Sequence, residues 1–279
     1  MKLTVISVST VVLSDLVRFN SRFQRQNPGI LELKLYNAAR RPGKDKIDAL
    51  KRDVEEADVV IADLMGSPAE LTSCVLEALK HCRGHIIPIG NGGREFLRLG
   101  SLNAGDVGMR GSRNAGMSSR NADTGREAMN VASMQKMMDM AEKMGKAIPF
   151  GKPRDMRNFV QIGKYWKNAG EAEIESLIYL LLRDYGGIKT VPAPRAAKEL
   201  EELCISSPST GEIFKSFEQY RHVFGINPEK PVVALLYYGH SYPNRTWGCV
   251  ADIAEKLKDF ANVLPVAFTR LSGNNTRFL

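Results

Sequence analysis

The stretch Ala57–Glu70, ADVVIADLMGSPAE, decides the fold. It opens with a mostly apolar run that a Gly-Ser-Pro turn closes, which is typical of a parallel strand buried on both faces. Ser67, Pro68 and Glu70 then offer an N-cap, a first-turn proline and a capping-box acid. The pattern therefore predicts a buried strand followed at once by a helix, which Gly84 closes at its C-terminal end.

The rest of the first hundred residues repeats this alternation of strand and helix. Strand patterns occur at LTVISVS, ILELKLYNA and HIIPIG, and helical spacing occurs over residues 10–26 and Asp45–Glu56. Strands that alternate with helices form a parallel sheet covered on both faces. The predicted fold class is therefore α/β, with a flavodoxin-like parallel-sheet domain over residues 1–100.

The region 101–225 is predicted to be a flexible Gly/Ser/Asn-rich loop followed by a mainly helical middle region. Thr124 and Glu127 form a second capping box, and nine of the 11 methionines lie between Met109 and Met156. We expect a Met-rich helix that packs on this protein, on a partner or on a flat ligand. Further helices are expected over Asn168–Gly186, Leu200–Cys204 and Gly211–Phe224.

Composition excludes several classes of protein. The formal net charge is +8, and residues 101–168 carry twelve Lys/Arg against six Asp/Glu. No nucleic-acid-binding motif accompanies this charge, so no nucleic-acid partner is expected. No apolar run approaches the roughly 20 residues of a membrane span, and no cleavage site follows the first strand. Four cysteines without a CxxC motif indicate reduced thiols, and the expected location is cytoplasmic.

Recognisable catalytic motifs are absent, because the sequence has no dinucleotide fingerprint, P-loop, GxSxG elbow or HExxH. GNGGRE follows the strand HIIPI, and Gly90, Gly92, Gly93 and Arg94 are candidates to bind an anion. A tight turn without a ligand is the alternative. No metal site is predicted, since Gly84 separates His81 from His85.

Residues 226–279 are predicted to form an incomplete second α/β domain of strand, loop, helix and strand. Ligands of open α/β sheets bind where the strands end. The loop after VVALLYY carries the candidate substrate-binding residues His240, Tyr242, Asn244, Arg245 and Trp247. The alternative is that these side chains cap the loop. Two strands and one helix cannot bury both faces of a sheet, so we expect order here to depend on a partner.

Several of these segments together carry a resemblance. ADVVIADLMGSPAE, HIIPIGNGGRE, IGKYWKNAGEAEIESLIYLLLRDYGG and KPVVALLYYGHSYPNRTWGCVADIAEKL occur in the order found in the N-terminal part of the large subunit of cobaltochelatase and magnesium chelatase. The chain resembles this CobN/H-subunit family, with Tyr165, Gly170 and Glu171 matching its tyrosine-glycine-glutamate motif. It departs from the family where Lys215 and Ser216 replace a His-Pro pair.

The resemblance implies the N-terminal portion of a tetrapyrrole-binding large subunit of an ATP-dependent metal chelatase, a ligase that forms nitrogen–metal bonds. Co²⁺ would be inserted into a cobyrinic-acid-type macrocycle in cobalamin biosynthesis, or alternatively Mg²⁺ into protoporphyrin. ATP and Mg²⁺ would bind to AAA+ partner subunits, and the remainder of the large-subunit chain would be a further partner. By itself this chain is expected to bind no cofactor and to be inactive.

Two rival readings lack catalysis. One is a flavodoxin-like module that binds a small phosphate-bearing ligand near Ser9, Gly66 and Gly90. The other is a partner-docking module that uses the Met-rich helix.

Overall fold

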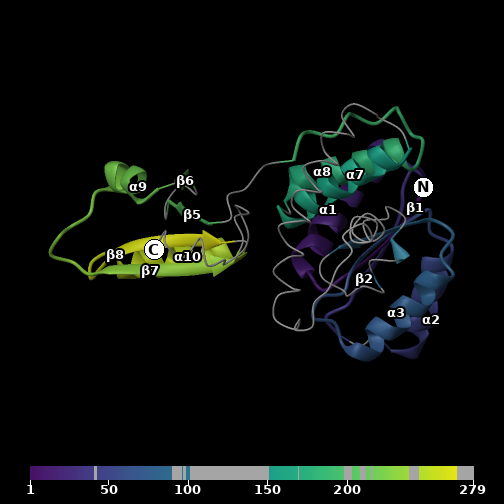
Figure 1. Cartoon of the computed structure of the whole chain (residues 1–279), viewed down its shortest axis with the longest axis horizontal. Coiled ribbons are helices and arrows are strands. Elements are labelled where there is room, and N and C mark those ends of the chain that lie inside the picture. Colours follow the sequence, from purple (N-terminus) through teal and green to yellow (C-terminus); the bar gives the residue numbers. More distant parts are fainter. Residues whose placement is uncertain are drawn as a thin grey trace, which may run out of the picture. The chain divides into compact units, whose positions relative to one another are not determined.

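The computed structural model describes residues 1–40, 43–89, 96, 99–100, 151–168, 170–197, 203–207, 212–214, 216–238 and 245–268. The chain divides into two compact units, Met1–Trp166 with Ile174–Ala196, and Lys167–Glu173 with Ala197–Leu279 (Figure 1). None of the helices in the described part of the chain has the length and apolar character needed to cross a bilayer.

The first unit is built on a parallel sheet of four strands in the order β2-β1-β3-β4. The strands are β1 (Lys2–Ser7), β2 (Glu32–Asn37), β3 (Val59–Asp63) and β4 (His85–Ile89). All three pairings are parallel, and the central strands β1 and β3 are in register from Leu3↔Val59 to Ser7↔Asp63. The predicted flavodoxin-like α/β sheet is therefore confirmed.

Helices cover both faces of this sheet (Figure 1). They are α1 (Thr10–Gln26), α2 (Lys44–Glu55), α3 (Ala69–Lys80), α7 (Gly151–Lys167) and α8 (Glu171–Asp184). α2 and α3 share one buried apolar cluster with strand residues such as Val60. On the other face, Tyr179 of α8 makes ring contacts with Phe19 and Phe23 of α1, at 6.1 and 6.4 Å. α7 lies with them and was not predicted from the sequence.

The ends of α3 differ from the prediction. Its N-cap is Pro68, because the Ser67 hydroxyl bonds to the Thr72 hydroxyl at 2.6 Å instead of to a helix amide. The helix ends at Lys80, and Gly84 lies immediately before β4. A Cβ at Gly84 would lie 2.2 Å from the Ala57 carbonyl oxygen, so this glycine permits a close backbone approach.

The second unit contains a mixed sheet in the order β6-β5-β8-β7. Its elements are β5 (Leu203–Ser206), β6 (Ile213–Phe214), α9 (Phe217–Phe224), β7 (Val232–Tyr238), α10 (Arg245–Leu257) and β8 (Asn262–Phe268). β7 and β8 are parallel and α10 connects them, which confirms the predicted strand, loop, helix and strand. β5 and β6 add antiparallel strands.

One predicted helix of the middle region is wrong, and another is confirmed with a later start. Leu203 and Cys204, expected to end the helix Leu200–Cys204, belong instead to strand β5, and all four residues of that strand are buried. The helix expected from Gly211 begins only at Phe217, because the Ser216 side chain accepts from the Gln219 amide at 3.3 Å and caps it there. Both differences arise in short apolar runs, where periodicity cannot separate helix from strand.

The extra strands and helix α9 correct the expectation that this sheet contains only two strands and one helix. On one face of the second sheet, Tyr220 of α9 packs with Phe214, Leu264 and Val266. On the other face, Val250 of α10 packs with Cys204, Tyr237 and Ala267. The unit therefore has two small apolar cores, one on each face.

Candidate functional site

Most residues predicted to bind ligands lie outside the described residues. These are Gly90, Gly92, Gly93 and Arg94 of the glycine turn and His240, Tyr242 and Asn244 of the loop before α10. The Met-rich segment 124–145 also lies outside them. Arg245 and Trp247 fall in the first turn of α10, which directly follows that loop.

A buried polar cluster does lie at the carboxyl ends of β1 and β3. The Ser7 hydroxyl donates to Asp63 Oδ2 at 3.1 Å, and the Trp166 indole N–H donates to the same oxygen at 3.4 Å. The Ser9 amide, at the N-terminus of α1, donates to the Ser7 hydroxyl at 2.9 Å. Asp63 is only 8% exposed. This Asp63 cluster (Ser7, Ser9, Asp63 and Trp166) therefore holds a carboxylate inside the first unit.

The position of the Asp63 cluster has a chemical consequence. In the strand order β2-β1-β3-β4, the connection from β1 leads toward one edge of the sheet and β3 lies on the other side of β1. Open α/β sheets bind their ligands at such a switch in strand order. The positive end of α1 already acts on the Asp63 charge, through the Ser9 amide and the Ser7 hydroxyl. An anionic ligand would face the negative charge of Asp63. The described groups of this edge therefore do not favour a phosphate.

An open groove of about 1250 Å³ lies at the opposite, amino-terminal edge of the same sheet. Eight of its lining residues are ionisable: Lys2, Glu55, Glu56, Asp58, His81, Arg83, His85 and Tyr185. Acidic and basic groups are mixed along it, and Lys2 is paired with Glu56 at 2.9 Å. Such a groove has no dominant sign of charge with which to select a ligand.

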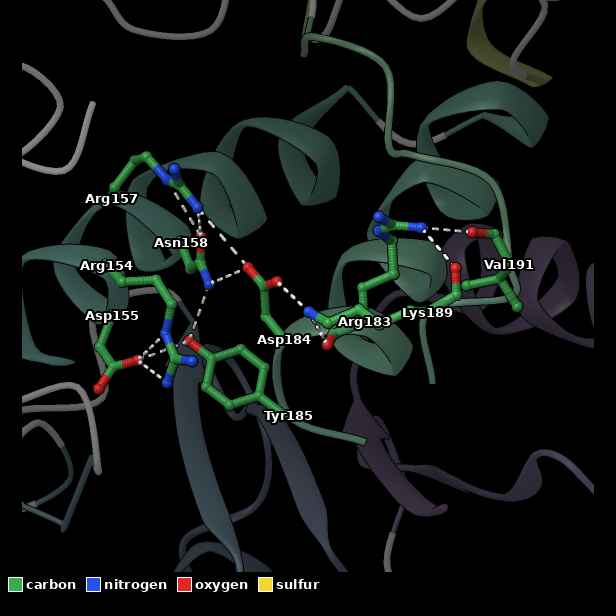
Figure 2. A network of polar contacts seen from close by, with 9 residues as sticks. All are labelled: Arg154, Asp155, Arg157, Asn158, Arg183, Asp184, Tyr185, Lys189 and Val191. Atoms are coloured by element: carbon green, nitrogen blue, oxygen red, sulfur yellow. Dashed lines mark hydrogen bonds and ion pairs between the residues drawn. The ribbon is translucent and has the colours of Figure 1, made fainter. Parts of the chain in front are cut away.

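Asn158 is the centre of a polar network beside this groove (Figure 2). Its side chain is fully buried, and its amide group donates to Asp184 Oδ2 at 2.9 Å and to the Tyr185 hydroxyl at 3.3 Å. Arg157 donates to the side-chain oxygen Oδ1 of Asn158 at 3.0 Å and forms an ion pair with Asp184 at 3.6 Å. These contacts fasten α7 to the C-terminal end of α8.

Tyr185 extends the network to the sheet (Figure 2). Its hydroxyl donates to Asp155 Oδ1 at 3.4 Å, the Arg154 guanidinium lies 5.5 Å from its ring centre, and the His85 ring lies 4.8 Å away. Burial raises the pKa of the Tyr185 phenol far above its ordinary value, and the nearby Asp155 charge raises it further. Tyr185 therefore stays protonated near neutral pH and can donate its hydroxyl hydrogen to Asp155.

In the second unit, the strand that leads to the predicted binding loop is well anchored. Tyr237, near the carboxyl end of β7, is buried, and its hydroxyl and the Ser206 hydroxyl are hydrogen-bonded at 2.8 Å. β7 ends at Tyr238 and α10 begins at Arg245. The loop between them thus leaves the carboxyl end of a parallel strand, as the sequence predicted. Across the described ranges, no three His, Cys, Asp or Glu side chains gather as metal ligands would.

Sequence reasoning missed the Asp63 cluster and the Asn158 network. A signal for Asp63 was present, because this carboxylate ends the otherwise apolar strand VVIAD. Nothing in the local sequence of Asn158 marks it as buried, since α7 itself was not predicted.

Two family models match consecutive parts of the chain. Residues 2–160, more than half of the chain, match a domain of unknown function, DUF3479. Residues 163–278 match CobN/Magnesium Chelatase. A search of curated proteins gave no match.

Among solved structures, the chain is similar to the catalytic subunit of cobaltochelatase from Mycobacterium tuberculosis, with 12% identity and a TM-score of 0.40. The match covers 99% of this chain and 17% of that one, so the chain spans a small part of the solved subunit.

Proposed function

We propose that this chain forms the N-terminal portion of the tetrapyrrole-binding large subunit of a metal chelatase, because residues 163–278 match CobN/Magnesium Chelatase and residues 2–160 match the DUF3479 domain. The observation that carries this proposal is the family match over residues 163–278. That range includes all of the second sheet and the loop that leaves β7.

The proposed reaction forms nitrogen–metal bonds in a macrocycle. It requires that water leaves the metal ion and that a base takes the pyrrole protons. Co²⁺ and a cobyrinic-acid-type macrocycle are the preferred substrates, and Mg²⁺ with protoporphyrin is the alternative. ATP and Mg²⁺ act on separate AAA+ subunits in this proposal. The cytoplasm remains the predicted location.

We place the macrocycle at the carboxyl end of β7, beside His240, Tyr242 and Asn244 of the loop and Arg245 and Trp247 of α10. Two arguments support this choice. A loop at the end of a parallel strand is where α/β sheets bind ligands. The corresponding place in the first unit is already filled by Asp63 and Trp166.

The two tryptophans allow this placement to be tested. In Trp166→Phe, Trp247 is the only reporter, and in Trp247→Phe, Trp166 is the only reporter. Titration with a cobyrinic-acid-type tetrapyrrole should quench Trp247 saturably at micromolar concentration and leave Trp166 nearly unchanged. Quenching of Trp166 alone would instead favour a small-molecule site at the first sheet.

Variants of histidine give a matched comparison. His240→Ala should weaken tetrapyrrole binding by roughly tenfold or more, which corresponds to about 1.4 kcal/mol. His222→Ala, at an exposed position of α9, should leave the dissociation constant unchanged. Equal dissociation constants for wild type and His240→Ala would remove His240 from the site.

The described residues bring together no set of carboxylates or imidazoles that could strip and hold a metal ion. We therefore propose that this chain alone does not insert metal. Incubation with Co²⁺, tetrapyrrole, AAA+ subunits and ATP should give no metallated product by absorbance. Turnover under these conditions would overturn this part of the proposal.

Partner docking without catalysis is the remaining candidate. It rests on the Met-rich segment. Loss of partner binding in Met134→Asp and Met138→Asp, with folding intact and tetrapyrrole binding unchanged, would favour it.

A further inference from the structure

Exposed apolar side chains are distributed unevenly between the two units. Ten large apolar side chains are exposed among the described residues, and seven belong to the second unit, which is the smaller one. They are Ile213, Val223, Phe224, Val232, Leu236, Ile253 and Phe260. Contiguous exposed apolar side chains mark an interaction surface, so the relevant members of this set are those that share one face of the sheet.

The exposed set includes one face of strand β7. Val232 and Leu236 are 51% and 53% exposed, and alternate residues of a strand point to the same face. Leu236 is level with Val266 of β8, so this is the face on which α9 packs. Within the described residues, the apolar cluster around α9 includes residues of β5, β6 and β8 and none of β7.

The edge of β7 is open as well. β7 ends the strand order β6-β5-β8-β7, so within the described ranges only β8 pairs with it. Its seven residues, VVALLYY, contain no charge and no proline. Natural proteins usually guard an edge strand with charges, proline, bulges or a covering element. An unguarded edge beside an uncovered face indicates that another element belongs on both.

The first unit shows what such an element is. β1-α1-β2 and β7-α10-β8 have the same build, with a strand, a helix and a parallel neighbour. In the first unit, the other edge of β1 carries the parallel strand β3, which leads into helix α3. The side chains of α3 then cover one face of that sheet.

We propose that the free edge of β7 accepts a further parallel, largely apolar strand whose attached helix covers Val232 and Leu236. The occupant is another segment of the large-subunit polypeptide, an assignment that rests on the proposed function. The solved cobaltochelatase subunit, of which this chain matches 17%, illustrates how much more chain such a subunit has.

A second copy of the chain fits this surface less well. Two β7 edges related by a two-fold axis would pair in antiparallel fashion and would satisfy the open edge. They would also place two bare faces with Val232 and Leu236 side by side, which enlarges the exposed apolar surface. A strand with its own helix satisfies the edge and the face together.

The experiment uses the full 279-residue chain and a synthetic peptide of residues 58–64, DVVIADL, which contain β3, extended by two lysines for solubility. β3 is the strand that fills the corresponding place on β1. Amide hydrogen exchange of β7 is followed by NMR. Since successive residues of a strand direct their amides to opposite edges, the peptide should slow every second amide of Val232–Tyr238 by at least tenfold.

Two matched controls accompany the peptide. A peptide with proline in place of the residue equivalent to Ile61 cannot complete the ladder and should give no protection. Leu236→Lys should abolish protection by the parent peptide. Val17→Lys, at an equally exposed position of α1 in the first unit, should leave it unchanged.

Three results would overturn the proposal. One is unchanged exchange of all β7 amides in the presence of the peptide. Another is slow exchange of every β7 amide in the free monomer, which would mean that this chain already covers its own edge. The third is a dimer by light scattering in which β7 is fully protected. Because no tetrapyrrole is present, these results are independent of macrocycle binding.

Discussion

Replacing Ser7 with alanine tests whether the Asp63 cluster holds the first unit together. Ser7 is fully buried, and its hydroxyl both donates to Asp63 and accepts from the Ser9 amide. A hydrogen bond to a charged group contributes about 1.5–3 kcal/mol, and a neutral one contributes about 0.5–1.5. We expect Ser7→Ala to lower the free energy of unfolding by about 3 kcal/mol. For a unit of this size, that is a fall of about 6–12 °C in Tm.

The measurement is urea unfolding followed by Trp166 fluorescence in a Trp247→Phe background. In this background, the signal reports the first unit alone, because Trp166 donates to Asp63. Ser14→Ala is the matched control on the exposed side of α1. Its hydroxyl donates to the Thr10 carbonyl at 2.8 Å, and its loss should change the free energy of unfolding by less than about 0.5 kcal/mol.

A double-mutant cycle with Asp63→Asn separates the hydrogen bond from the effect of each side chain. The two residues are in direct contact, so the changes should fail to add by about 1–2 kcal/mol. A loss in Ser7→Ala no larger than that in Ser14→Ala would refute the reasoning. Strict additivity of the changes in the free energy of unfolding for Ser7→Ala and Asp63→Asn would also refute it, because the Asp63 carboxylate would then not depend on the Ser7 hydroxyl.

Further predictions concern the first unit. Gly84→Ala should lower the free energy of unfolding by more than about 3 kcal/mol in urea, because its Cβ would meet backbone at 2.2 Å. Gly163→Ala, in open space within α7, should raise it by about 0.5–1 kcal/mol. Asn158→Ala should cost about 2–4 kcal/mol on urea unfolding, since the fully buried Asn158 side chain is lost and a partly buried carboxylate and phenol are left with fewer partners. A loss below about 1 kcal/mol would contradict this role. Burial raises the pKa of the Tyr36 and Tyr185 phenols in the folded state. Their contribution to the free energy of unfolding is therefore full below about pH 10 and is lost as the pH rises further. Unfolding titrations at alkaline pH should show this fall, and Tyr185→Phe should make it shallower.

Much of the fold could be predicted from local pattern. The strands of the first sheet are apolar runs bounded by turn residues, and α1 spans the predicted residues 10–26. The pattern failed where tertiary contacts decide the structure. Leu203–Ser206 is a strand because β8 lies beside it, with paired residues 61 or more positions later in the chain, and no local signal contains that information.

The candidate site divides in the same way. The sequence predicts that the loop after β7 leaves the carboxyl end of a parallel strand, because strand direction follows from the order of strand and helix. It does not predict that Trp166 reaches Asp63, 103 residues away in sequence. The same holds for Asn158, which lies in α7, and Tyr185, which directly follows the end of α8. A polar pair of this kind depends on how two helices pack, and apolar periodicity constrains only their buried faces.

The contrast between the two sheets indicates how the units divide their roles. In the first, helices cover both faces, and the place between β1 and β3 where a ligand would bind is filled by Asp63 and the Trp166 indole. In the second, β7 has an open edge and a bare face within the described ranges. A sheet that is covered on both faces has little surface for a further element, whereas a sheet with an open edge can add a strand, bind a ligand or do both. We therefore expect further elements and ligands to bind to the second unit. Strand addition at β7 would also fix the strand from which the proposed macrocycle loop departs. Strand addition at β7 and macrocycle binding at the following loop are therefore expected to be coupled. The DVVIADL peptide should tighten tetrapyrrole binding, and Leu236→Lys should remove this effect without changing tetrapyrrole binding in the absence of the peptide.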